Sequence, residues 1–127
     1  MSDSPFKSKG GLGRLTGALR YSLQGLAAAV RHEAAFRQEL LLAVALTPVA
    51  FWLGRSPLEI AALLATVVFV LILELINSAL EAVADAVTLE RHPLIGRAKD
   101  LGSAAVLLAL IFAGAVWLTF LYSRLSS

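Results

Sequence analysis

The sequence predicts an all-α membrane protein, with three transmembrane helices and an N-terminal amphipathic helix on the membrane surface. The first observation is composition, because 58% of the 127 residues are hydrophobic and only 16% are charged. Mean hydropathy is +0.78, above that of ordinary soluble domains, and the length allows a single membrane domain over 1–127. The second observation is that charged residues leave three long segments uncharged. A very apolar soluble helical bundle is the alternative.

Residues 14–31 form the first predicted element, an amphipathic surface helix. Its apolar side chains recur at helical spacing and share one face: Leu15, Leu19, Leu23, Leu26 and Val30. Basic and polar residues lie roughly opposite, where they can meet anionic headgroups. An alternative is that Arg14 and Tyr21, on the flank of this helix, contact a ligand.

The transmembrane helices are predicted at about 34–53, 57–87 and 98–123. The uncharged segment Leu101–Ser123 is long enough, at 1.5 Å per residue, to cross a hydrocarbon core of about 30 Å. The uncharged segment Leu40–Gly54 is shorter and must include turns from either end. Ser56 and Pro57 favour a helix start, as N-cap and first helical residue. The polar stretch Thr88–Gly96 forms the second connection.

Lysine and arginine placement predicts the orientation. Nine of the 11 precede the first span or lie around the second connection: Lys7, Lys9, Arg14, Arg20, Arg31, Arg37, Arg91, Arg97 and Lys99. Arg55 and Arg124 lie on the opposite side. Because cytoplasmic loops carry the excess of positive charge, we expect a cytoplasmic N-terminus and an external C-terminus.

The second predicted span carries a polar stripe. Glu74, Asn77, Glu81 and Asp85 follow one another at offsets of 3, 4 and 4 residues, which places them on one helix face. A charge at the bilayer centre costs roughly 2.5–3.5 kcal/mol on the insertion scale. The stripe therefore predicts a functional site, with polar contacts between helices or proton carriage in a small transporter as alternatives.

Carboxylates near the cytoplasmic interface predict a Mg²⁺ site, since Mg²⁺ prefers oxygen ligands and accompanies phosphates. Glu33 and Glu39, at the start of the first span, lie at a depth similar to that of Glu81 and Asp85. The chain has no cysteine, which excludes disulfides, thiolate zinc sites and iron–sulfur clusters.

A second polar cluster opens the third span, at Gly96–Ser103. Lys99, Asp100 and Ser103 can share a face there, and a helix N-terminus at a basic interface suits phosphate. Anchoring by cytoplasmic positive charge is the alternative. The Walker motif and the motifs of soluble protein kinases are absent, so a nucleotide would have to bind differently.

The stretch Glu74–Asp85 resembles the signature E-x-[LIVM]-N-[ST]-[SA]-[LIV]-E-x-x-V-D of the small prokaryotic diacylglycerol kinases. It departs from that signature at Ala84, a packing position where valine is usual. Two flanking blocks, Glu33–Glu39 and Gly96–Val106, are also similar to this family, in its proteobacterial branch. The resemblance extends over about 14–123.

The resemblance implies an integral membrane enzyme that uses ATP and Mg²⁺ to phosphorylate 1,2-diacylglycerol to phosphatidic acid. It further implies a homotrimeric helical bundle in the bacterial inner membrane, with the C-terminus in the periplasm. Active sites would lie at the cytoplasmic interface and be shared between neighbouring subunits.

The resemblance also implies roles for individual residues. Glu74 corresponds to the general base, Glu33 and Glu81 to metal ligands, and Asn77 and Asp85 to supporting residues. The corresponding ATP contacts are Arg14, Tyr21, Glu33, Glu81, Glu90, His92, Lys99 and Asp100. The corresponding lipid contacts are Arg14, Ala35, Phe36, Arg37, Gln38, Glu39, Glu74 and Ser103.

Two other functions stay open at this point. A related branch of the family phosphorylates undecaprenol, although the blocks around Glu33 and Lys99 resemble the diacylglycerol branch. The remaining alternative is a proton-coupled transporter that uses Glu74 within an oligomer.

Overall fold

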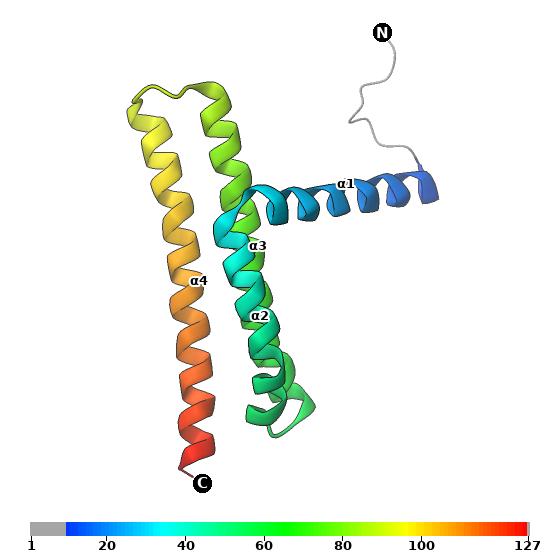
Figure 1. Cartoon of the computed structure of the whole chain (residues 1–127), viewed down its shortest axis with the longest axis vertical. Helices are drawn as coiled ribbons and strands as arrows, with labels where there is room; N and C mark the ends of the chain where they lie inside the picture. Colours follow the sequence, from blue (N-terminus) through cyan, green and yellow to red (C-terminus); the bar gives the residue numbers. More distant parts are fainter. Residues whose placement is uncertain (1–9, 127) are drawn as a thin grey trace.

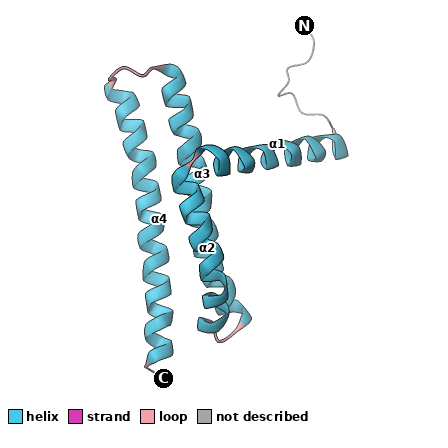
Figure 2. Ribbon diagram, viewed as in Figure 1, coloured by secondary structure: helices cyan, strands magenta, loops and turns pink. Residues whose placement is uncertain are grey.

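The computed structural model describes residues 10–126, all of which belong to helices or to short connections between them (Figure 2). Its four helices are α1 (Gly11–His32), α2 (Ala34–Leu53), α3 (Pro57–Val87) and α4 (Pro93–Leu125). Lys7 and Lys9, which contribute to the predicted cytoplasmic charge, lie outside the described residues.

Helices α2, α3 and α4 form a bundle, and α1 projects sideways from it (Figure 1). α3 packs most extensively against α4 and then against α2, whereas α1 packs against α2. The connection between α3 and α4 lies beyond the level of α1, at the far end of the bundle from the C-terminus (Figure 1). α3 and α4 therefore extend past the level of α1 on one side, and α2, which begins at that level, follows them on the other (Figure 1).

The bundle helices confirm the predicted fold class. α2, α3 and α4 are each long and apolar enough to cross a membrane. Large apolar side chains cover the outside of the bundle, including Leu41, Leu108 and Leu118, which are 71%, 66% and 66% exposed. Soluble proteins rarely expose such continuous apolar surface, whereas lipid-facing helices require it.

Capping residues explain where α3 and α4 begin. The Ser56 hydroxyl accepts a 3.1 Å hydrogen bond from the Glu59 N–H, and Pro57 is the first helical residue of α3. α4 begins in the same way, because His92 Nδ1 accepts a 3.1 Å hydrogen bond from the Leu94 N–H and Pro93 follows the cap. α4 thus starts before the predicted residue 98, within the stretch expected to be a connection.

An elbow at Glu33 joins α1 to α2. Its backbone is extended, with φ −112° and ψ 103°, between two helical residues. Arg37 holds the elbow from the α2 side, since its Nη1 donates hydrogen bonds of 2.9 and 3.1 Å to the carbonyls of Val30 and Arg31. These carbonyls belong to the last turn of α1, where helical acceptors lack partners. Arg37 therefore fixes α1 at its angle to the bundle.

A hydrogen bond between Thr66 of α3 and Trp117 of α4 joins these two helices. Trp117 Nε1 donates a 3.0 Å hydrogen bond to Thr66 Oγ1, and the Thr66 hydroxyl donates in turn to the Leu63 carbonyl at 2.7 Å. Thr66 is buried, at 4% exposure. An apolar replacement would leave the indole N–H without its acceptor inside the bundle.

We expect Thr66→Val to lower the free energy of unfolding by about 1 kcal/mol, the size typical of hydrogen bonds between membrane helices. Unfolding in detergent micelles measures this. Thr119→Val is the matched control, because the Thr119 hydroxyl bonds to the Ala115 carbonyl of its own helix and is exposed. Equal losses in the two variants would contradict a specific role for the contact between Thr66 and Trp117.

Candidate active site

Glu74 is a buried carboxylate at the first position of the predicted polar stripe, at 7% exposure. The register of α3 turns it toward the neighbouring helices, together with buried Val70 one turn earlier. A carboxylate shielded from water needs partners or a chemical task, since its burial alone is unfavourable. Glu74 is thus the centre from which the site can be described.

Three further carboxylates lie close enough to Glu74 for like-charge repulsion. They are Glu33 at the elbow, Glu39 on α2 and Glu81 on α3, two turns along from Glu74. Charges of one sign that converge at a helix junction attract a cation or a positively charged ligand. The four residues, called the carboxylate cluster below, were predicted to act in metal, base or lipid roles.

Asn77 and Glu81 form a pair along α3. Asn77 Nδ2 donates a 2.9 Å hydrogen bond to Glu81 Oε1, one turn away on the same face. Glu81 is otherwise exposed, so this donor is what orients its carboxylate. Asn77 thereby connects the buried part of the stripe to its exposed end.

Asp85 and Lys99 connect α3 to α4 beyond Glu81. Lys99 Nζ donates a 2.6 Å hydrogen bond to Asp85 Oδ1, and the two side chains are 42% and 48% exposed. A half-exposed pair of this kind contributes little to stability by itself. Its consequence here is positional, because it holds an ammonium group beside the exposed end of the stripe.

A hollow of about 540 Å³ lies at the connection between α3 and α4. It brings together three of the residues predicted to contact ATP: Glu90, His92 and Lys99. The Glu90 N–H donates a 3.0 Å hydrogen bond to Thr88 Oγ1, which shapes the connection. His92 also caps α4, so its Nδ1 already has a structural partner.

A second hollow, of about 750 Å³, lies between α1 and α3. Glu33 lines it together with Ser22 and His32 of α1, and Leu75 and Ser78 of α3 complete the opposite wall. Because Glu33 belongs to the carboxylate cluster and lines this hollow, the hollow lies beside the cluster.

Arg14 and Tyr21 lie on α1 and are exposed. The first turns of α1, which carry Arg14, point away from the bundle (Figure 1). One chain therefore does not bring Arg14 to the carboxylate cluster, although both were predicted to belong to one site. Asp100 is exposed on α4, next to Lys99.

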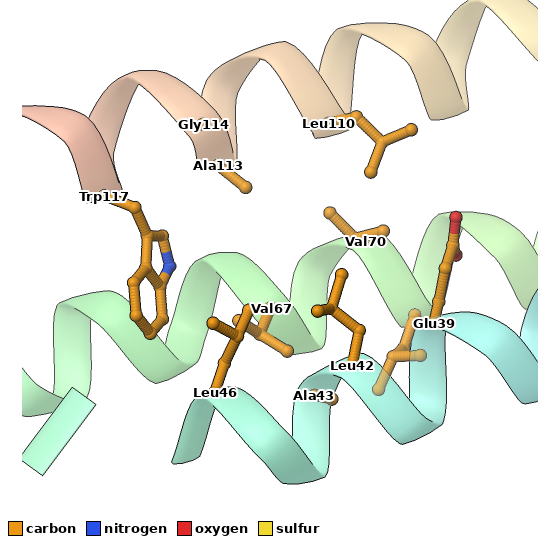
Figure 3. Close-up of a pocket in the computed structure, with 11 residues that line it drawn as sticks. Glu39, Leu42, Ala43, Leu46, Val67, Val70, Leu110, Ala113, Gly114 and Trp117 are labelled. Atoms are coloured by element: carbon orange, nitrogen blue, oxygen red, sulfur yellow. The ribbon is translucent and has the colours of Figure 1, made fainter. Parts of the chain in front are cut away.

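An apolar cavity of about 270 Å³ is lined by α2, α3 and α4, with Glu39 at one end and Trp117 at the other (Figure 3). Leu42, Val70 and Leu110 are among the residues between them (Figure 3). Glu39 Oε2 is buried and has no hydrogen-bond partner among residues 10–126. The cavity thus combines an apolar chamber with an unsatisfied carboxylate oxygen.

The other residues predicted to contact lipid differ in environment. Ala35 and Gln38 are exposed on α2 and Ser103 is exposed on α4, whereas Phe36 is buried at 3% exposure. The Arg37 guanidinium is bound to the carbonyls at the end of α1, a structural role that the sequence did not indicate. The sequence could not predict this role, because the acceptors are backbone carbonyls of the preceding helix, which any residue type supplies.

The acidic residues fit a magnesium–nucleotide complex better than a bare metal. Within the part of the chain that the structure describes, no three acidic or histidine side chains converge into a complete metal site. Mg²⁺ bound with a nucleotide commonly needs only one or two protein carboxylates, because phosphates and water complete its shell. Glu33 and Glu81, both close to Glu74, can supply these two carboxylates.

The chain is similar to known proteins over most of its length. The family model for prokaryotic diacylglycerol kinase matches residues 20–121. A relative named diacylglycerol kinase from Pseudomonas aeruginosa is 54% identical over 121 residues, which cover 95% of this chain and 98% of the relative. Relatives of the same name from Haemophilus influenzae and Escherichia coli are 50% and 45% identical, covering 84% and 90% of this chain and 91% and 93% of their own lengths. The chain belongs to the prokaryotic diacylglycerol kinase family.

Proposed function

We propose that this chain is an ATP-dependent kinase that phosphorylates 1,2-diacylglycerol to phosphatidic acid. The observation that carries the proposal is the buried carboxylate of Glu74 within the carboxylate cluster, in a chain of this family. A lipid hydroxyl at headgroup depth needs a base that is also at that depth. Glu74, on a membrane helix, meets this requirement.

The reaction transfers the γ-phosphoryl group of ATP to the lipid hydroxyl. A new bond forms between the hydroxyl oxygen and the γ-phosphorus, while the bond from that phosphorus to the bridging oxygen of ADP breaks. Glu74 accepts the hydroxyl proton as the new bond forms. The products are phosphatidic acid and ADP, and the carboxyl group of Glu74 later releases its proton.

The exposed end of the stripe is proposed to bind the nucleotide. Glu33 and Glu81 would hold Mg²⁺, which neutralises charge on the phosphates when it is bound. Lys99, held in place by Asp85, supplies a cation at the same end of the bundle. The remaining proposed nucleotide contacts are Arg14, Tyr21, Glu90, His92 and Asp100.

The cavity that contains Glu39 supports a lipid as the acceptor. Its apolar walls suit an acyl chain, and Glu39 at its one acidic end lies close enough to Glu74 to place that chain beside the proposed base. Arg14, the segment Ala35–Glu39 and Ser103 are proposed to contact the rest of the lipid.

We further propose that three chains associate and share their active sites. The support is that Arg14 lies at the end of α1 that points away from its own bundle, where a neighbouring chain could receive it (Figure 1). The exposed leucines of α1, such as Leu15 and Leu19, would lie on the cytoplasmic face of the inner membrane. This orientation leaves the C-terminus in the periplasm.

We expect Glu33→Gln and Glu81→Gln each to raise the Mg²⁺ concentration for half-maximal activity by at least roughly tenfold. Loss of a residue that only hydrogen-bonds to a metal ligand already weakens metal binding by about that factor. The amide keeps the shape of the side chain and loses the charge. A Mg²⁺ titration of activity measures the shift. Glu59→Gln is the control, because Glu59 lies in the first turn of α3, at the other end of the helix. Unshifted titration curves in both variants would show that neither residue binds the metal.

Phosphate transfer by the purified protein tests the function itself. The protein in detergent micelles is given ATP labelled at the γ-position together with diacylglycerol. We expect labelled phosphatidic acid in an amount equal to the ADP formed. Proton flux without ATP turnover would instead support the transporter alternative and overturn the kinase proposal.

A further inference from the structure

Gly102 lies on α4 directly against the side chain of Asn77 on α3. A Cβ built on Gly102 would overlap Asn77 Oδ1 and would lie 3.3 Å from Leu80 Cδ2. A residue with any side chain therefore forces the Asn77 carboxamide or one of the two helices to move. Asn77 Oδ1 is buried and has no hydrogen-bond partner within residues 10–126. Asn77 Oδ1 therefore packs against Gly102 and accepts no conventional hydrogen bond from these residues.

The two ends of the Asn77 carboxamide explain its orientation. Nδ2 donates to Glu81 Oε1, and the reversed amide would turn Oδ1 toward that carboxylate, where two acceptors repel. With Nδ2 facing Glu81, Oδ1 has to face α4. A Cβ built on Gly102 would overlap Oδ1, so a Cα hydrogen of Gly102 points toward this oxygen. Such hydrogens are weak donors of a kind that recurs where helices pack closely.

We propose that Gly102 is a positioning residue for the nucleotide site. Its missing side chain lets the Asn77 carboxamide pack against α4, and the packed carboxamide holds the Glu81 carboxylate in one orientation. This inference rests on the proposed function, in which Glu81 shares the Mg²⁺ of the nucleotide. Gly102 itself touches neither substrate, so its effect passes through Asn77.

The kinetic test is Gly102→Ala. We expect the KM for Mg·ATP to rise by roughly 10- to 100-fold, as when a partner of a metal ligand is lost, with an unchanged KM for diacylglycerol. A purely structural role would instead lower the amount of active protein and leave both KM values unchanged. Gly114→Ala makes the same change on the same helix, and a Cβ there meets nothing within 4 Å. Because Gly114 lines the apolar cavity proposed for the acyl chain, its control reading is the KM for Mg·ATP, which should stay unchanged. A wild-type KM for Mg·ATP in Gly102→Ala would overturn the proposal.

A double-mutant cycle tests whether Gly102 acts through Asn77. Asn77→Ala removes both the donor to Glu81 and the oxygen that Gly102 accommodates, so we expect it to raise the KM for Mg·ATP by itself. Adding Gly102→Ala should then raise the KM no further. Thermal unfolding in micelles gives a second cycle that needs no substrate. Gly102→Ala should lower the unfolding midpoint more when Asn77 is present than in the Asn77→Ala background, where only the 3.3 Å approach to Leu80 Cδ2 remains.

The outcomes separate this inference from the proposed function. Fully additive effects in both cycles, or a wild-type KM in Asn77→Ala, would overturn the role of Gly102. If Gly102→Ala alone does not fold while the double variant does, the contact with Asn77 is supported. A parent protein without kinase activity would overturn the proposed function, whereas the unfolding cycle would still test the contact between the two residues.

Discussion

Glu74→Gln is expected to reduce phosphoryl transfer by about 10²- to 10⁴-fold, the usual contribution of a positioned general base. The amide is nearly the same size as the carboxylate and cannot accept the lipid proton. Because it is also easier to bury than a charged group, we expect the variant to be at least as stable as the parent. Turnover, nucleotide affinity and unfolding in micelles are measured on the same preparation.

The alternative for Glu74 is a polar contact that holds helices together, and stability separates the two roles. A contact of that kind would weaken the assembly when its charge is removed, whereas a base leaves the assembly intact and inactive. Glu59→Gln is the control, because it makes the same change on the same helix at the end away from the site. If the variant keeps more than about a tenth of the parent turnover, the loss is smaller than the smallest effect of removing a general base, and Glu74 is not the base.

Mixed assemblies of two inactive variants are expected to regain about a quarter of the parent activity if each site combines residues of neighbouring chains. Chains with Glu74→Gln are mixed in equal amounts with chains that carry Arg14→Ala. A site is complete when it receives Glu74 from one variant and Arg14 from the other, which random mixing provides at about one site in four. Activity after subunit exchange, with each variant alone as reference, measures the recovery.

The matched control for this experiment is a mixture of Glu74→Gln with Glu33→Gln. Within one chain, Glu33 lies close enough to Glu74 for their charges to interact, so a complete pair cannot be assembled from these two variants. We expect no recovery in the control mixture. If the mixture with Arg14→Ala also stays inactive after exchange has been verified, the shared site is wrong.

The fold class could be predicted because membrane helices leave a strong signal in sequence. The charge-free segments specified the spans, and Ser56 with Pro57 marked a helix start through local capping. The start of α4 at Pro93 could not be predicted as readily. The polar residues of Thr88–Gly96 resemble a loop, and the cap that starts the helix is a histidine side chain.

The carboxylate residues could be predicted because the stripe on α3 follows from helical periodicity alone, and the family resemblance is confirmed by the match over residues 20–121. The proximity of Glu39 to Glu74 could not, because it depends on how α2 packs against α3. The same holds for Gly102, whose importance appears only once Asn77 of another helix lies against it. Periodicity assigns residues to a face, but only packing shows which faces meet.

The proposed function is tested most directly by competition between two lipid alcohols. The purified protein in micelles receives γ-labelled ATP, Mg²⁺ and equal amounts of diacylglycerol and undecaprenol, and the labelled lipids are separated. We expect the label in phosphatidic acid. Label mainly in undecaprenyl phosphate, or in neither lipid, would contradict the account.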